Sequence, residues 1–114
     1  MTVIEARNHR GKKEVLLSSV ISCKGNDDSV VIYTNDGEFM INNKLYEIDQ
    51  LERFIRISKS CVVNITKIKD ASPIFNSRIR LKMINGNVEY VNRTYIKVFK
   101  DYLKGGVDKW LEFI

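Results

Sequence analysis

Eleven basic side chains between residues 53 and 100 are the group in this sequence with the clearest chemical meaning. Only two acids, Asp70 and Glu89, lie in the same block, so its formal charge is +9, whereas residues 1–52 carry −3 and residues 101–114 carry −1. The basic residues are Arg53, Arg56, Lys59, Lys67, Lys69, Arg78, Arg80, Lys82, Arg93, Lys97 and Lys100. A concentrated positive field attracts polyanions, and nucleic acid is the first candidate. A solvated charged surface without a partner is the alternative.

Side chains that usually perform catalysis are sparse. His9 is the single histidine and lies in a polar stretch, whereas acid–base or nucleophilic catalysis needs a positioned histidine, a carboxylate pair or an activated thiol. Asp27 and Asp28 have no third oxygen ligand at calcium-loop spacing. The glycines Gly105 and Gly106 follow an expected helix and so do not form a phosphate-binding loop. The sequence predicts no enzyme, no catalytic residue, no cofactor and no metal site.

The length of 114 residues predicts one domain with its own core. The sequence has no apolar run long enough for a membrane helix, and its first residues lack the apolar segment of a secretion signal. Cys23 and Cys61 stand alone in apolar runs, where a thiol is usually a small hydrophobe. We therefore expect a cytoplasmic protein with reduced thiols and no membrane partner.

Most of the chain has the residue pattern of β-strands. β-Branched and aromatic runs separated by turn residues predict short strands, and Asp36-Gly37 and Asn85-Gly86 predict hairpin turns. In one strand the apolar side chains Ile79, Leu81 and Met83 alternate with basic ones, which places the basic side chains on the outer face. Ser72-Pro73 and Asn76-Ser77 are expected to bound a loop. The expected strands are 15–17, 20–23, 29–34, 38–41, 54–57, 61–65, 67–71, 78–84 and 88–91.

Two segments have helical spacing instead. Residues 43–51 place Leu45, Ile48 and Leu51 on one face, with Asn42 or Asn43 as the cap. A second amphipathic helix is expected after Asn92 as its cap, ending at Gly105-Gly106. Its apolar face consists of Tyr95, Val98, Phe99, Tyr102 and Leu103. The remaining tail, 107–114, is expected to pack on the domain or to contact a partner.

The segment from residue 54 to residue 68, FIRISKSCVVNITKI, resembles the core signature of the LytTR DNA-binding domain. This domain is the output module of LytR/AlgR-type response regulators. The residues on the marked positions of that signature are Phe54, Arg56, Ser60, Val63, Asn64 and Ile68. Further matches arrive in family order: the early strand at 20–23, the hairpin at Asp36-Gly37, the short helix before the signature, the strand and turn at 81–86, and the closing motif at 90–97.

The resemblance covers residues 12–104, with a short N-terminal segment at 1–11 and a tail at 105–114. It implies a mainly β, elongated fold of about ten short strands with one or two short helices. Such domains bind duplex DNA with loops that enter successive major grooves, and two copies usually occupy a promoter direct repeat. Transcription regulation is the implied function.

Three segments should then touch DNA. The implied contact residues are Lys24, Asn26, Arg56, Ser58, Lys59, Ser60, Asn92, Arg93 and Thr94. Arg93 is the strongest candidate for reading a guanine, because a guanidinium binds O6 and N7 together. The alternatives remain a solvated Lys59, an Arg93 paired with an acid at the helix start, and an Arg56 that braces its strand instead of contacting phosphate. Asn64 is expected to bond to the backbone.

Some positions depart from the family pattern. Ser58 stands where histidine is common, Asp27 and Asp28 stand where a basic residue or histidine is common, and Asn92 and Thr94 replace serine and arginine. The operator therefore does not follow from relatives. Residues 1–14 are too short for a receiver domain, so regulation is expected from a receiver domain in a longer chain or from a separate regulatory protein.

The competing hypothesis is an interaction domain that uses its basic face for an acidic protein or for single-stranded RNA. Single-strand binding needs exposed aromatic side chains between the basic ones. Most of the five aromatics in the basic block are expected to be buried, which argues against RNA.

Overall fold

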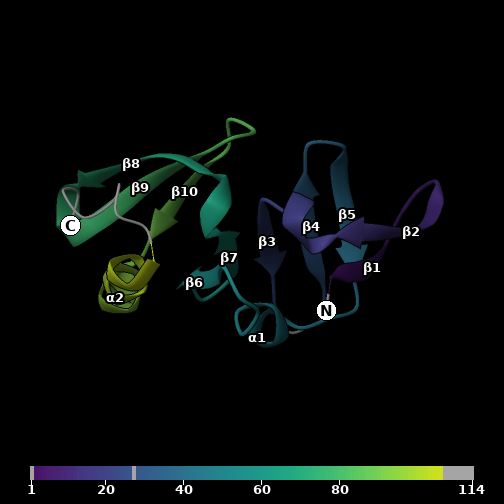
Figure 1. The fold of residues 1–114 in the computed structure, drawn as a ribbon, viewed down its shortest axis with the longest axis horizontal. Helices are drawn as coiled ribbons and strands as arrows, with labels where there is room; N and C mark the ends of the chain where they lie inside the picture. The colour runs from purple at the N-terminus through teal and green to yellow at the C-terminus, as the bar shows by residue number, and fades with distance from the viewer. Residues whose placement is uncertain (1, 27, 107–114) are drawn as a thin grey trace.

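Ten antiparallel strands in two sheets, with two short α-helices, make up the part of the chain that the structure describes, residues 2–26 and 28–106. The structure is a computed structural model, and it is elongated, with extents of 43 × 25 × 24 Å (Figure 1). The mainly β, elongated architecture expected from the sequence is confirmed.

The larger sheet has the strand order β2-β1-β5-β4-β3-β7-β6. Its strands are β1 (Val3–Asn8), β2 (Gly11–Leu16), β3 (Ser22–Gly25), β4 (Val30–Thr34), β5 (Gly37–Ile41), β6 (Phe54–Ser58) and β7 (Cys61–Asn64). The hairpin between β4 and β5 closes at Gly37, whose φ of +124° suits glycine. Helix α1 (Leu45–Ile48) connects β5 to β6 and buries Leu45 and Ile48.

The smaller sheet has the order β10-β9-β8 and consists of β8 (Ile68–Ile74), β9 (Arg78–Met83) and β10 (Val88–Val91). In β9, Ile79, Leu81 and Met83 are buried and Lys82 is exposed, so the predicted alternation is confirmed. Helix α2 (Ile96–Gly106) follows β10 and lies beside one end of this sheet (Figure 1).

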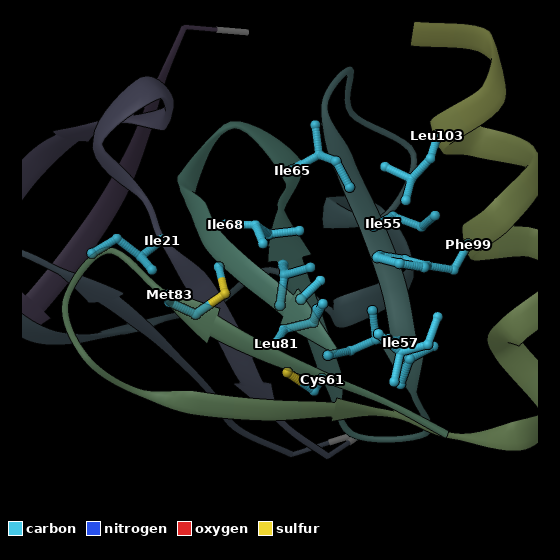
Figure 2. Close-up of a cluster of buried hydrophobic side chains, with 14 residues drawn as sticks. Ile21, Ile55, Ile57, Cys61, Ile65, Ile68, Leu81, Met83, Phe99 and Leu103 are labelled. Carbon is cyan, nitrogen blue, oxygen red and sulfur yellow. The ribbon is translucent and has the colours of Figure 1, made fainter. Parts of the chain in front are cut away.

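The part of the larger sheet around β7 is covered on both faces, which explains why all four residues of β7 are buried. Val63 belongs to a core between the two sheets, whereas Val62 belongs to a second core on the opposite face. Helix α2 closes the first core with Phe99 and Leu103, which are 0% and 1% exposed and point toward the strands (Figure 2). Val98, predicted on the same helical face, is 57% exposed, because the buried stripe is narrower than the spacing indicated.

Three expectations about the strands were wrong or incomplete. The strand expected at 15–17 begins already at Gly11, and Leu17 lies in a 3₁₀ turn. Residues 3–8, set apart in the sequence as an N-terminal segment, form β1 between β2 and β5, with Ile4 and Ala6 in the core. The predicted loop boundary at Ser72-Pro73 lies inside β8, where Pro73 is opposite Ile79. β8 is an edge strand, and an edge strand tolerates proline because its missing N–H faces away from the ladder.

Both predicted helix caps are corrected. The residue at the start of α1 is Lys44, whose backbone N–H donates to the Glu47 carboxylate at 2.8 Å, so the carboxylate replaces the expected Asn42 or Asn43. Asn92 precedes a 3₁₀ turn at residues 93–95, and its side chain makes no capping hydrogen bond. Its backbone carbonyl accepts from Tyr95 instead, at 2.8 Å. The predicted tail, 107–114, lies outside the described residues.

Candidate nucleic-acid interface

The three segments predicted to contact DNA lie next to one another in the fold, and we call residues 24–29, 58–60 and 92–94 the three-segment edge. The backbone N–H of Gly25 donates to the Ser60 carbonyl at 3.0 Å, which joins the first segment to the second. The N–H of Asn92 donates to the Ile57 carbonyl at 2.9 Å, which joins the third segment to the end of β6. Segments far apart in sequence are therefore fixed relative to one another by main-chain hydrogen bonds.

The first segment forms a tight turn after β3. The side-chain oxygen of Asn26 accepts from the N–H groups of Asp28 and Ser29, at 2.8 and 3.1 Å, so Asn26 shapes the turn. A Cβ atom at Gly25 would collide with the backbone of Ser29 and Val30, and only glycine fits there. Asp27 lies outside the described residues.

Lys24 is held by an ion pair. Its Nζ lies 2.9 Å from Oε2 of Glu89 on β10 and 5.6 Å from the centre of the Tyr33 ring. The Lys24 side chain is 40% exposed and that of Glu89 only 7%, so the carboxylate depends on this lysine for charge compensation. Burial lowers the pKa of Lys24, but the hydrogen bond and the charge of Glu89 outweigh it, and the net pKa is raised.

Glu89 also faces a cysteine. Its Oε1 lies 3.9 Å from Sγ of Cys61, which is 5% exposed. Burial first, and then the charge of Glu89, raise the pKa of Cys61 to about 12. Burial also raises the pKa of Cys23. Both thiols are free and stay protonated at neutral pH, which agrees with the expectation of small buried hydrophobes.

The second segment is braced by Arg56. Its Nε donates to Oδ2 of Asp49 at 3.1 Å, and its guanidinium donates to the Lys59 carbonyl at 2.7 Å. Arg56 therefore holds the turn between β6 and β7, as one of the two sequence interpretations proposed. Ser58 adds to this turn, since its Oγ accepts from the N–H of Ser60 at 3.3 Å.

Lys59, Arg93 and Thr94 are exposed and make no side-chain hydrogen bond or ion pair within the described residues. The alternative in which Arg93 pairs with an acid at the helix start is not present in this part of the chain. The three-segment edge therefore offers two uncompensated cations, Lys59 and Arg93, at positions that the backbone fixes.

Asn64 has the role expected of it. It is 2% exposed, its amide donates to the Val20 carbonyl at 2.9 Å, and its Oδ1 accepts from the N–H of Thr66 at 3.0 Å. Asn64 thus joins β7 to the segment before β3, and its side chain is too buried to contact a ligand.

The sequence did not reveal Glu89 and Asp49 as partners of the basic residues. A signal for Glu89 was present, because it is two residues from Val91 and so shares the inward face of β10. The partner of Arg56 is seven residues away across a turn, and no periodic pattern marks such a contact.

Among the described residues, no three histidine, cysteine or acidic side chains are grouped as a metal site would require. In the same part of the chain, neither helix has the length and apolar character needed to cross a membrane.

Known proteins resemble this chain both in fold and in sequence. The solved LytTr DNA-binding domain of a Bacillus cereus protein superposes with a TM-score of 0.84 and 25% identity, covering 90% of this chain and 97% of that one. The sensory transduction protein LytT of Bacillus subtilis (strain 168) is 31% identical over 113 residues, which is 87% of this chain and 47% of LytT.

An uncharacterized HTH-type transcriptional regulator of Staphylococcus aureus (strain NCTC 8325) is 32% identical over 89 residues, covering 76% of this chain and 60% of the relative. The chain thus spans about half the length of these relatives. The LytTr DNA-binding domain family matches residues 11–104. This protein therefore belongs to the LytTR family of DNA-binding domains.

Proposed function

We propose that this domain binds specific duplex DNA sequences through the three-segment edge and thereby regulates transcription. The supporting observation is that main-chain hydrogen bonds from Gly25 and Asn92 hold the three segments together while Lys59 and Arg93 remain uncompensated. Protein–DNA affinity comes mainly from cations near phosphates, whereas specificity needs side chains held in a fixed position at base edges. The edge combines both properties.

The residues of the edge divide into two groups by their contacts. Arg93 would bind a guanine through O6 and N7, and Lys59 would contact phosphate or a neighbouring base. Lys24, Asn26 and Arg56 already have protein partners, so they would act by fixing the segments. The exposed hydroxyl and amide groups of Ser60, Asn92 and Thr94 are available for hydrogen bonds to phosphate or bases.

We further propose that two copies bind a direct repeat in a promoter. The long dimension of 43 Å exceeds the rise of one turn of B-DNA, which is about 34 Å. A domain of this length laid along the duplex reaches across successive grooves on one face. Copies on repeats spaced by about one or two turns would therefore face the same side of the DNA.

The test is a selection of bound duplexes from a random pool, followed by binding measurements at two salt concentrations. Enrichment of a repeated half-site, with two domains bound per duplex, is the expected result. Salt-sensitive binding without enrichment would reduce the function to nonspecific contact. Absence of binding to any duplex would refute the proposal.

Two exposed aromatic side chains favour testing RNA as well. Phe75 is 86% exposed and Tyr90 42% exposed, with the Arg78 guanidinium 5.4 Å above the Tyr90 ring, whereas Phe54 and Phe99 are buried. Tyr95 is partly buried against the core, so the expectation that most aromatics in the basic block are buried holds only in part. Single-stranded RNA should be included as a competitor, and tighter binding of RNA than of the selected duplex would favour the alternative function.

A further inference from the structure

A groove next to the three-segment edge is not accounted for by the proposed contacts. It lies between α2 and the turn that joins β8 to β9. Figure 1 shows this turn at the end of the smaller sheet, beside α2. The groove has a volume of about 520 Å³. It is lined by Ser77, Arg93, Ile96, Lys97, Lys100 and Asp101.

The charges in this groove are strongly one-sided. Arg93, Lys97 and Lys100 are spaced by four and three residues, which places them on one side of the helical segment. Asp101 is the single acid in the lining. In the described part of the chain, none of the three cations has a hydrogen-bond or ion-pair partner. A hollow with three uncompensated cations is a site for a polyanion.

The other wall of the groove is a strained turn. Asn76 and Ser77 have φ values of +64° and +60°, which residues with a side chain rarely adopt. Ser77 thus lines the groove from a turn in which two consecutive residues take a left-handed conformation. Ser77 lines the same hollow as the three cations.

We propose that this groove binds the phosphates of a DNA strand that continues beyond the base contacted by Arg93. The inference rests on the proposed function, because Arg93 belongs both to the three-segment edge and to the groove lining. From Arg93 to Lys100 the helical rise is about 10 Å. This distance corresponds to about three nucleotides along a duplex, at 3.4 Å per step. Lys97 and Lys100 would thus lengthen the footprint without reading sequence.

The salt dependence of binding tests the groove. Each phosphate contact contributes about 0.9 to the slope of log K against log salt concentration, so the double variant Lys97→Gln/Lys100→Gln should lower the slope by about 1.8. The matched control is Lys69→Gln/Lys82→Gln, which removes the same charge from exposed positions toward the opposite end of β8 and β9 from Ser77. The control should leave the slope within error of the wild type. Equal changes in both variants would show a general charge effect and overturn the groove.

Replacing charged phosphates of the DNA by neutral methylphosphonates shows which phosphates the groove contacts. A selected duplex with methylphosphonates at the three positions flanking the guanine should bind the wild-type domain more weakly and should bind the double variant without further loss. An independent, additive loss in the double variant would overturn the proposal. Circular dichroism and a thermal unfolding curve of each variant verify that the fold is intact. If the wild type binds the selected duplex and the slope of the double variant is unchanged, the groove proposal fails while the proposed function stands.

Discussion

Lys24 and Arg93 are both basic, both lie in the three-segment edge, and they differ in what surrounds them. Lys24 is bound to the buried Glu89 at 2.9 Å. Arg93 is exposed and has no partner in the described residues. Equal formal charges thus have unequal availability for a ligand.

This contrast shows how a charged edge is built. A lysine whose charge is compensated by a buried carboxylate contributes to the position of its strand, because the pair joins β3 of one sheet to β10 of the other. An uncompensated arginine on a fixed turn contributes to binding. Substitution of Lys24 or its partner should therefore lower mainly the free energy of unfolding, whereas substitution of Arg93 should lower mainly the affinity for DNA.

The largest expected effect is on folding, from Glu89→Gln. This variant leaves the Lys24 ammonium without its counter-charge, and we expect the free energy of unfolding to fall by about 2–3 kcal/mol, below the full value for a buried pair because Lys24 reaches solvent. Urea unfolding measures the loss. The double variant Lys24→Met/Glu89→Leu should recover much of it, since it removes both charges. Asp70→Asn, at an exposed acid of the same basic block, is the control and should change little. A loss from Asp70→Asn equal to that from Glu89→Gln would contradict the distinction.

The next effect is on binding, from Arg93→Ala. Loss of a bidentate guanine contact should weaken binding to the selected duplex by about 1–3 kcal/mol and relax specificity at one base pair. The free energy of unfolding should change by less than about 0.5 kcal/mol, since no partner is lost. Titration of duplexes with each of the four base pairs at that position measures the discrimination. Arg93→Lys, which keeps the charge but not the planar fork, should restore affinity more than specificity. A uniform loss across all four base pairs would show that Arg93 contacts phosphate.

A smaller effect is expected from alkaline pH at Cys61, next to Glu89. Burial raises the pKa of Cys61 in the folded protein to about 12 from an ordinary value of 9.0, so above pH 9 the unfolded state releases a proton that the folded state retains. Stability from this group is therefore complete below pH 9 and is lost as pH rises toward 12, by about 1 kcal/mol at pH 10. Urea unfolding between pH 8 and pH 10 measures the slope. Cys61→Ala should make it shallower. If the free energy of unfolding of Cys61→Ala depends on pH as steeply as that of the wild type, groups other than Cys61 cause the pH dependence.

Most of the fold was predictable because its signals are local. The alternation at Ile79, Leu81 and Met83 follows from a period of two, and the turn at Gly37 follows from its requirement for positive φ. The strand β1 was not predictable in this way. Its inward residues Ile4 and Ala6 give a weak pattern, and the strand is stabilised by pairing with β2 and β5, which is a tertiary contact.

The sequence predicted which segments form the site, but it did not predict which side chains contact one another there. The family resemblance selected the three segments, and the hydrogen bonds of Gly25 and Asn92 show that they are adjacent. The partner of Lys24 depends on packing β10 of the smaller sheet against the larger sheet. No sequence spacing contains that arrangement, which is why the sequence placed both Lys24 and Arg93 among the DNA contacts.

The smallest expected effect compares the two lysines of the edge directly. Lys59→Gln removes an exposed cation that has no partner in the described part of the chain, so the slope of log K against log salt concentration should fall by about 0.9. Lys24→Gln removes a cation already compensated by Glu89, and its slope should change by clearly less. Binding of the selected duplex at four salt concentrations, with the folded fraction of each variant verified by circular dichroism, gives both slopes. Equal slopes would mean that Lys24 leaves Glu89 and contacts phosphate in the complex. The distinction between a cation that fixes its strand and a cation that binds DNA would then not apply to the bound state.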